Sequence, residues 1–238
     1  MRAPKTLLAA LVLFALVILC GTWITAHAQE GKPQVDYKVV VKPKARSPKN
    51  VIYLIDASGS MVTRVETMVV KGELKQYCFR DRSKTKTAIS AFRVFAAQGL
   101  DDGKLLACTF GNELRTWKRG WVGLPNKTAI DDIAIWASKQ AKHDYVTRLA
   151  QPLDRAMKAK PRELMVVIVS DGRFYERDDA ILTVLKRANL TRTFGGRPAC
   201  MVSCVGVDGG SPTLEAIARA GGGAYITVSA VTSRTRGR

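Results

Sequence analysis

Two short polar segments carry oxygen ligands at a spacing suited to metal chemistry. Asp56, Ser58 and Ser60 directly follow an apolar run at residues 51–55, and Ser170 and Asp171 end a second run that begins at 164. Short β-branched runs are typical of buried parallel strands, and ligands bind at the carboxyl ends of such strands. Carboxylates and hydroxyls are hard donors that suit Mg²⁺ or Mn²⁺. With only two acidic ligands the ion would stay electrophilic, so an incoming carboxylate can replace one of its waters.

The elements needed to position these residues alternate along the chain. Strand-like apolar runs lie at 51–55, 104–110, 164–169 and 201–207, with a last strand at 224–229, and helical patterns lie at 87–97, 129–141, 149–157, 179–188 and 212–220. Buried strands alternating with amphipathic helices predict an α/β domain with a doubly wound, Rossmann-like, mostly parallel sheet flanked by helices on both faces. The region 62–86 fits either an extended first helix or an inserted excursion.

The segment Asp56-x-Ser58-x-Ser60, placed after a hydrophobic strand and followed by Met61, resembles the opening of the von Willebrand factor type A (VWA) domain and its metal ion-dependent adhesion site. Segments 164–172 and 201–229 resemble the later Asp-Gly strand of that family and its closing strand, helix, glycine-rich turn and strand. The resemblance covers about residues 50–229. It implies a VWA-type fold in which Ser58, Ser60 and a loop threonine supply hydroxyl ligands, while Asp56 and Asp171 bind the ion directly or through water.

Thr147 is the best match to the loop threonine of the family, although Tyr145 and Val146 stand where the family often has glycines. Thr128 is a rival that would instead cap the next helix. The resemblance therefore implies a metal site of Asp56, Ser58, Ser60, Thr147 and Asp171 for Mg²⁺ or Mn²⁺. The alternative for Asp56 and Ser58 is that they cap the helix that follows, and Ser170 is expected to bond local backbone groups.

Enzymatic chemistry finds little support in the sequence. A serine nucleophile needs a neighbouring base, and His143 is the only histidine after residue 28. The sequence has no GxSxG elbow, GxGxxG motif or GxxxxGK[ST] loop to support a hydrolase or a nucleotide-binding enzyme. We therefore expect a protein-binding module and no enzyme, and a metal-dependent hydrolase remains an alternative.

The first 28 residues have the pattern of an export signal. Arg2 and Lys5 precede a nearly continuous apolar stretch, and residues 26–28, Ala-His-Ala, match a signal-peptidase site. The prediction is a signal peptide at 1–28, a basic linker with a short edge strand at 29–49, a VWA domain at 50–229 and a basic disordered tail at 230–238. The expected location is the periplasm, the cell surface or the medium. An uncleaved N-terminal membrane anchor is the alternative.

The charge balance is strongly basic, with 38 Lys and Arg against 20 Asp and Glu, for a formal net charge of +18. Such a surface attracts anions, so the candidate partners are a protein that presents an acidic residue, an anionic polysaccharide or a membrane surface. Nucleic acid is not expected, because export is predicted and aromatic residues do not alternate with the basic clusters. The alternative function is a structural or envelope-associated protein that binds anionic polymer by charge.

Four cysteines follow the predicted signal peptide, at positions 78, 108, 200 and 204. An even number permits disulfides in an exported protein, with three possible pairings. Cys200 and Cys204 lie on one predicted strand, where residues four apart are separated by ~13 Å, and so do not pair with each other. No CxxC or HxxxH motif indicates zinc. The simplest expectation is that these are buried thiols.

Overall fold

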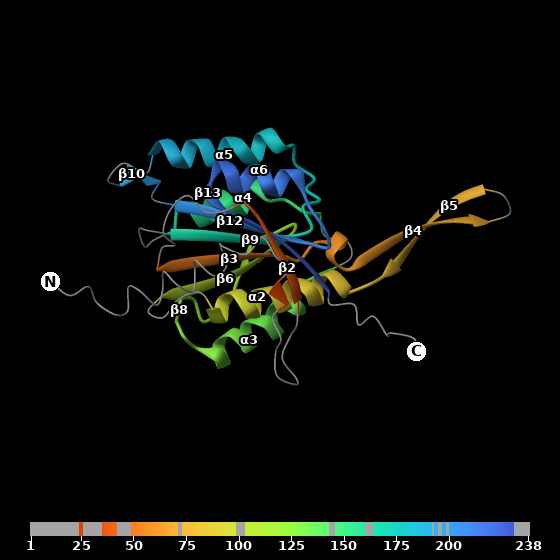
Figure 1. The fold of residues 1–238 in the computed structure, drawn as a ribbon, viewed down its shortest axis with the longest axis horizontal. Helices are drawn as coiled ribbons and strands as arrows, with labels where there is room; N and C mark the ends of the chain where they lie inside the picture. The colour runs from red at the N-terminus through yellow and green to blue at the C-terminus, as the bar shows by residue number, and fades with distance from the viewer. Residues whose placement is uncertain are drawn as a thin grey trace.

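A computed structural model describes residues 24–25, 35–41, 49–70, 73–98, 103–142, 146–159, 164–191, 193–194, 197–198 and 200–230. Its centre is a nine-stranded sheet in the order β1-β2-β13-β12-β9-β3-β6-β7, with β8 also paired to β6 (Figure 1). The strands are β1 Ile24–Thr25, β2 Val35–Val41, β3 Asn50–Asp56, β6 Lys104–Phe110, β7 Arg115–Thr116, β8 Val122–Gly123, β9 Leu164–Ser170, β12 Cys200–Val207 and β13 Gly222–Ala230.

The five central strands, β6, β3, β9, β12 and β13, pair in parallel, so their carboxyl ends share one edge. Antiparallel strands flank them: β2 pairs with β13 on one side, and β7 and β8 pair with β6 on the other. The chain passes from β3 to β6 in one direction, and the later strands are then added from β9 onwards on the opposite side of β3. The order of the strands therefore reverses between β3 and β9, which is where open α/β sheets bind ligands.

Helices cover both faces of the sheet. α2 (Ser83–Gln98) and α3 (Lys127–Ser138) lie on one face, and α4 (Ala150–Met157), α5 (Asp178–Thr191) and α6 (Pro212–Ala220) lie on the other (Figure 1). Successive side chains of β3 point to opposite faces, so Tyr53 packs with Phe92 of α2 while Leu54 joins the cluster that contains Leu153 of α4. The predicted fold class, a doubly wound and mostly parallel sheet between two helical layers, is confirmed.

The region between β3 and α2 contains a β-hairpin. β4 (Thr63–Val70) and β5 (Glu73–Arg80) pair with each other over their full length and project away from the domain (Figure 1). A short 3-10 helix, η1 (Gly59–Met61), precedes the hairpin, and α2 begins at Ser83. The sequence left two interpretations of residues 62–86, an extended first helix or an inserted excursion. The structure shows the excursion.

Several predicted bounds shift by a few residues. The helix expected at 129–141 ends at Ser138, and the last strand begins at Gly222. Part of the expected linker, Val35–Val41, forms β2 beside β13, and β10 (Thr193–Phe194) and β11 (Arg197–Pro198) make a small separate ribbon. Apart from β1, the expected signal peptide lies outside the described residues, as does the tail from 231. Where the structure describes the chain, no helix has the length and apolar character to cross a membrane.

The cysteines are distributed between core and surface. Cys108, Cys200 and Cys204 are buried, as expected, and burial raises the pKa of the Cys108 thiol. Cys78 is exposed, which contradicts the expectation, because it lies on the hairpin, where no second layer covers the strands. Within the described part of the chain the cysteines form no disulfide.

Candidate metal centre

Asp56 and Asp171 lie at the carboxyl ends of β3 and β9, at the point where the strand order reverses. Asp56 is the last residue of β3, and Asp171 follows Ser170, the last residue of β9. The two strands pair in register up to Ile55 and Val169, which brings the two aspartates to the same edge of the sheet. Parallel pairing thus joins two segments that lie far apart in the sequence.

Asp56 is held by hydrogen bonds on both carboxylate oxygens. Its side chain is buried, Oδ1 accepts the Ser58 N–H at 2.9 Å, and Oδ2 accepts the Ser170 hydroxyl at 2.6 Å. Burial raises the pKa of Asp56 to about 6, because the charged form loses its hydration, and the hydrogen bonds from Ser170 and Ser58 work against this rise. Asp56 is therefore a fixed carboxylate whose charge is incompletely neutralised by its surroundings, and a bound cation would stabilise that charge.

The two loop serines continue this network across the sheet edge. The Ser58 and Ser60 hydroxyl oxygens lie 3.1 Å apart, and the Ser60 hydroxyl donates to Asp171 Oδ1 at 3.1 Å. Ser58 precedes η1, but its side chain makes no capping hydrogen bond. The helix-capping alternative for Ser58 is therefore wrong, because its hydroxyl bonds Ser60 in place of a backbone N–H.

Asp171 carries more interactions than the sequence suggested. Its side chain is only 2% exposed, and Oδ1 accepts the Arg173 N–H at 3.2 Å in addition to the Ser60 hydroxyl. Oδ2 accepts the Lys84 ammonium at 2.7 Å, and Arg173 Nε lies 3.8 Å from the same oxygen. A cation already faces this carboxylate in the form of a lysine side chain.

Thr147 reaches the same edge through its main chain. Its residue is buried, and its carbonyl accepts the Tyr175 N–H at 2.9 Å, four residues after Asp171. The next residue, Arg148, donates its N–H to the Gly111 carbonyl beyond β6. The structure thus bonds the side chains of Ser58, Ser60 and Asp171 to one another, joins Asp56 to them through the Ser58 N–H, and places the Thr147 loop beside them.

The rival threonine lies elsewhere. Thr128 is in the first turn of α3, whose cap is Asn126, the side chain of which accepts the Ala129 N–H at 2.9 Å. Just before that helix, Leu124 bonds Gly103, which precedes β6. Thr128 is therefore near the amino ends of the strands, at the edge opposite Asp56.

Sequence reasoning missed Lys84 and Arg173, and it gave Ser170 only a local role. Ser170 accepts the Gly172 N–H at 3.0 Å, the local role expected for it, but it also orients Asp56. Its position beside Asp171 at a strand end was an available signal. Lys84 gave no signal, because it stands 87 residues from Asp171 and only the fold brings the two together.

The donor chemistry of the site fits a hard divalent cation. All of the predicted ligands, two carboxylates and three hydroxyls, bind through oxygen, and four of them are linked within hydrogen-bonding distance. In the part of the chain that the structure covers, no group of three or more His, Cys, Asp or Glu side chains is placed to hold a metal ion. Any metal bound here would thus depend on the serine and threonine hydroxyls as well as on the two carboxylates.

Comparisons with known proteins find similar solved structures but no matching family model. No family model matches the sequence, and a search of curated proteins finds no match. Among solved structures, the chain resembles the conserved hypothetical protein BatB from Bacteroides thetaiotaomicron (17% identity, 77% of this chain and 92% of that chain, TM-score 0.49). It also resembles a von Willebrand factor type A structure from Catenulispora acidiphila, with 14% identity over 84% of this chain and 46% of that chain and a TM-score of 0.49. The manganese-loaded TRAP protein of Plasmodium vivax is similar as well, with 13% identity over 78% of this chain and 65% of that chain and a TM-score of 0.44.

One of these structures is described as von Willebrand factor type A, the family that the DxSxS segment resembles. The identities are below 25% and the TM-scores below 0.5, so the likeness adds no argument about binding. The chain spans 46% of the Catenulispora protein. The fold class rests on the parallel register and the strand order, and the site rests on its own hydrogen bonds.

Proposed function

We propose that this chain is an exported VWA-type domain that binds a protein partner through a divalent cation, Mg²⁺ or Mn²⁺, which coordinates an acidic residue of the partner. The ligands of the ion are Asp56, Ser58, Ser60, Thr147 and Asp171. The observation that carries the proposal is the bonded series from Ser58 through Ser60 to Asp171, which joins oxygen donors 111 residues apart in the sequence at the ligand-binding edge of the sheet.

Each residue has a distinct task in this proposal. Ser170 and the Ser58 N–H hold the Asp56 carboxylate in one orientation, and Ser60 and the Arg173 N–H do the same for Asp171. The bound ion would supply a positive centre with replaceable water. Because the protein contributes only two carboxylates, the ion would keep enough positive charge to attract a third carboxylate from a partner.

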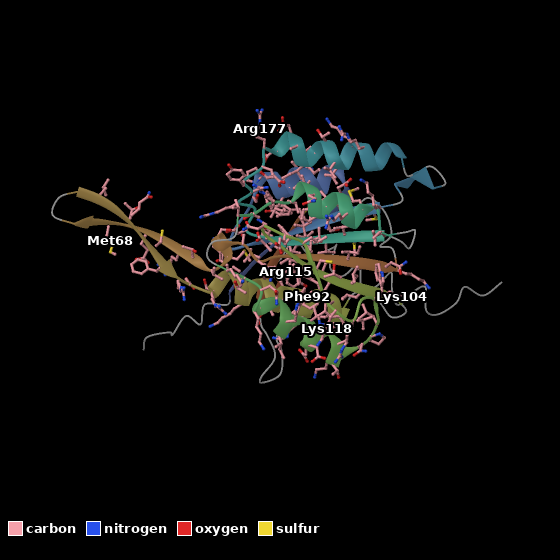
Figure 2. All side chains as sticks on the ribbon, turned by 180° about the vertical axis from the view of Figure 1, so that it is seen from behind. Met68, Phe92, Lys104, Arg115, Lys118 and Arg177 are labelled. Carbon is pink, nitrogen blue, oxygen red and sulfur yellow. The ribbon has the colours of Figure 1, made fainter. Side chains whose placement is uncertain are left out.

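The rim of the site supports an acidic partner. Arg173 has a side chain that is 68% exposed, and the Arg148 guanidinium lies 5.9 Å from the ring centre of Tyr175, which is itself 74% exposed. Figure 2 shows Arg177 on the same side of the molecule as the hairpin that carries Met68, while Lys104, the first residue of β6, is on the far side. Arginine and tyrosine side chains of this kind anchor protein interfaces, and the positive charge steers an acidic protein.

The geometry favours binding over catalysis. The Ser58 hydroxyl neighbours that of Ser60, and the Ser60 hydroxyl donates to a carboxylate that is also paired with Lys84. A serine nucleophile needs a base positioned to take its proton, and Asp171 is engaged by two cationic side chains. His143 lies outside the described residues. The proposed role is therefore non-enzymatic.

Thermal unfolding with added ion tests the metal site. We expect Mn²⁺ or Mg²⁺ to raise the Tm of the full chain and chelator to reverse the rise, because an ion that binds the folded state stabilises it. The variant Asp171→Asn should lose the rise. Asp132→Asn is the matched control. It removes an exposed carboxylate of α3 that pairs with Arg119, and this variant should keep the rise in Tm. An equal response of the wild type and Asp171→Asn would refute the proposed site.

A second experiment separates the metal-mediated function from the alternative, attachment to anionic polymer through the net charge of +18. NMR of the Mg²⁺-loaded chain with a peptide that bears one glutamate, and with its glutamine counterpart, reports on the acidic contact. We expect shifts at the site with glutamate only, abolished by chelator and retained in high salt. Binding to anionic polysaccharide that high salt abolishes and chelator does not would favour the alternative.

Export is tested by the N-terminus of the protein isolated from its producing cell. Cleavage at the predicted signal-peptidase site gives a mature chain that begins at Gln29. A mature chain that retains Met1 would instead support the membrane-anchor alternative.

A further inference from the structure

Lys84 is a cation built into the proposed metal site. It lies in the first turn of α2, and its ammonium donates to Asp171 Oδ2 at 2.7 Å. The Lys84 side chain is 18% exposed and that of Asp171 is 2% exposed, so most of this ion pair is shielded from water. Shielding strengthens the attraction between the two charges, and Lys84 is therefore a strong occupant of that side of Asp171.

The position of Lys84 is unfavourable for its own helix. The amino end of a helix carries partial positive charge and favours anions, as Asp81 shows by accepting the Ser83 N–H at 2.7 Å. A lysine in the first turn opposes that dipole. The ion pair with Asp171 compensates for this position. The Lys84 charge also opposes the rise in the pKa of Asp208 that burial causes.

We propose that Lys84 is a tethered cation that competes with the divalent ion for Asp171, and thereby sets the concentration of Mg²⁺ or Mn²⁺ at which the site fills. This inference rests on the proposed function. An ammonium and a divalent ion attracted to the same carboxylate repel each other, so filling the site weakens the contact between Lys84 and Oδ2. The released ammonium adds positive charge to the rim, which favours an anionic partner once metal is bound.

The test compares Mn²⁺ affinities, measured by electron paramagnetic resonance, of the wild type, Lys84→Met, Lys84→Arg and Lys86→Gln, all in the full chain. Methionine keeps the length of the side chain without its charge, and arginine keeps the charge. Lys86→Gln is the matched control, because Lys86 is an exposed lysine two residues further along the same helix. We expect Lys84→Met to bind Mn²⁺ about tenfold more tightly or better, since it removes a unit of like charge beside the ion.

Lys84→Arg and Lys86→Gln should bind Mn²⁺ with affinities close to that of the wild type. Without metal, Lys84→Met should have a lower Tm than the wild type, because Asp171 loses its closest cation. If Lys84→Met binds Mn²⁺ no more tightly than the wild type does, the competition is refuted while the metal site stands. If no variant binds Mn²⁺ and the wild type does not either, both this inference and the proposed function fail.

A labelling measurement on the wild type needs no substitution. Reductive methylation modifies free lysine amines, and mass spectrometry locates the modified positions. We expect Lys84 to be protected in the metal-free chain and to react several-fold faster at saturating Mn²⁺, while Lys86 reacts at the same rate in both. An unchanged Lys84 rate in a chain that binds Mn²⁺ would overturn the proposal, because the ion pair would then have persisted beside the metal.

Discussion

The loop of the candidate site and the β4–β5 hairpin follow each other in the chain, yet they are held in opposite ways. Ser58 is fully buried and Asp56 is 2% exposed. The Asp56 carboxylate accepts hydrogen bonds from Ser170 of β9 and from the Ser58 N–H, and the Ser58 hydroxyl bonds that of Ser60. On the hairpin, Leu74 is 76% exposed and Phe79 is 43% exposed. The loop is fixed by distant segments, whereas the hairpin is fixed by its own backbone pairing.

The difference shows which part of this edge the fold depends on. The hairpin joins the domain at its base, where Asp81 donates its N–H to the Val62 carbonyl and the Thr85 hydroxyl donates to the Met61 carbonyl. Beyond that base it is a two-stranded ribbon, which is marginally stable by itself in water. Changes in the site loop should therefore alter the free energy of unfolding of the whole domain, and changes on the hairpin should not.

The largest expected effect comes from the buried charge of Asp56. Its pKa rises from 3.8 to about 6 on folding, so between these values the folded state holds a proton that the unfolded state has lost. Stability from this group is full below pH ~3.8 and falls as pH rises towards ~6, by about 3 kcal/mol in total. Chemical denaturation of the metal-free chain at several pH values, relative to Asp56→Asn, measures this difference.

The free energy of unfolding of the wild type relative to Asp56→Asn should therefore decrease as pH rises through this window. A relative stability that stays constant, or that increases with pH, would show that Asp56 is not an incompletely compensated buried carboxylate.

Removing the hydroxyl that orients Asp56 should have the next largest effect. Ser170→Val takes away the 2.6 Å hydrogen bond to Asp56 Oδ2 and leaves a buried carboxylate short of one partner. Hydrogen bonds to charged groups contribute about 2 kcal/mol, so we expect a loss of that size in urea unfolding at neutral pH. Thr67→Val also removes a hydroxyl, at an exposed hairpin position, and should cost little. Equal losses in the two variants would contradict the contrast between site and hairpin.

The junction between hairpin and domain should show an intermediate effect. Asp81 accepts the Ser83 N–H at the start of α2, and this hydrogen bond lowers the pKa of the Asp81 carboxyl. Asp81→Ala removes the capping side chain and should cost about 1 kcal/mol, measured by urea unfolding at neutral pH. Asp81→Asn retains an acceptor oxygen and should recover most of the loss. Failure of asparagine to do so would mean that the charge of Asp81 matters more than its hydrogen bond.

The hairpin should show the smallest effect on stability. Leu74→Ser replaces a mostly exposed side chain, and surface substitutions of this kind change the free energy of unfolding by less than about 0.5 kcal/mol. Urea unfolding of Leu74→Ser beside the wild type measures this. A loss comparable with that of Ser170→Val would mean that the hairpin packs on the domain in solution and is not an independent projection.

Local sequence signals were sufficient where the governing interactions are local. The strand at Lys104–Phe110 and the helix at Pro212–Ala220 have the predicted bounds, since an apolar run and a cap are each complete within a few residues. Ser211 caps that helix as expected, accepting the Leu214 N–H at 3.3 Å. Asp56 and Asp171 come together at the sheet edge because each lies at the end of a parallel strand, and parallel strands share that edge.

Other features depend on what lies next to a segment in space. The sequence of residues 62–86 fits either a helix or an excursion, and the structure shows a hairpin. Cys78 and Phe79 are exposed on this hairpin because no second layer covers it. The second bond of Ser170, to Asp56, spans 114 residues. No local pattern encodes such a contact.

The sequence by itself determined the α/β class, the order of most strands and helices, and the oxygen donors of the candidate site, because burial periodicity and motif spacing are properties of short segments. The tertiary structure alone decided that Lys84 faces Asp171 and that the hairpin stands apart from the domain. Both depend on which segments, distant in the chain, the sheet brings together, since charge pairing and burial act through space and not along the sequence.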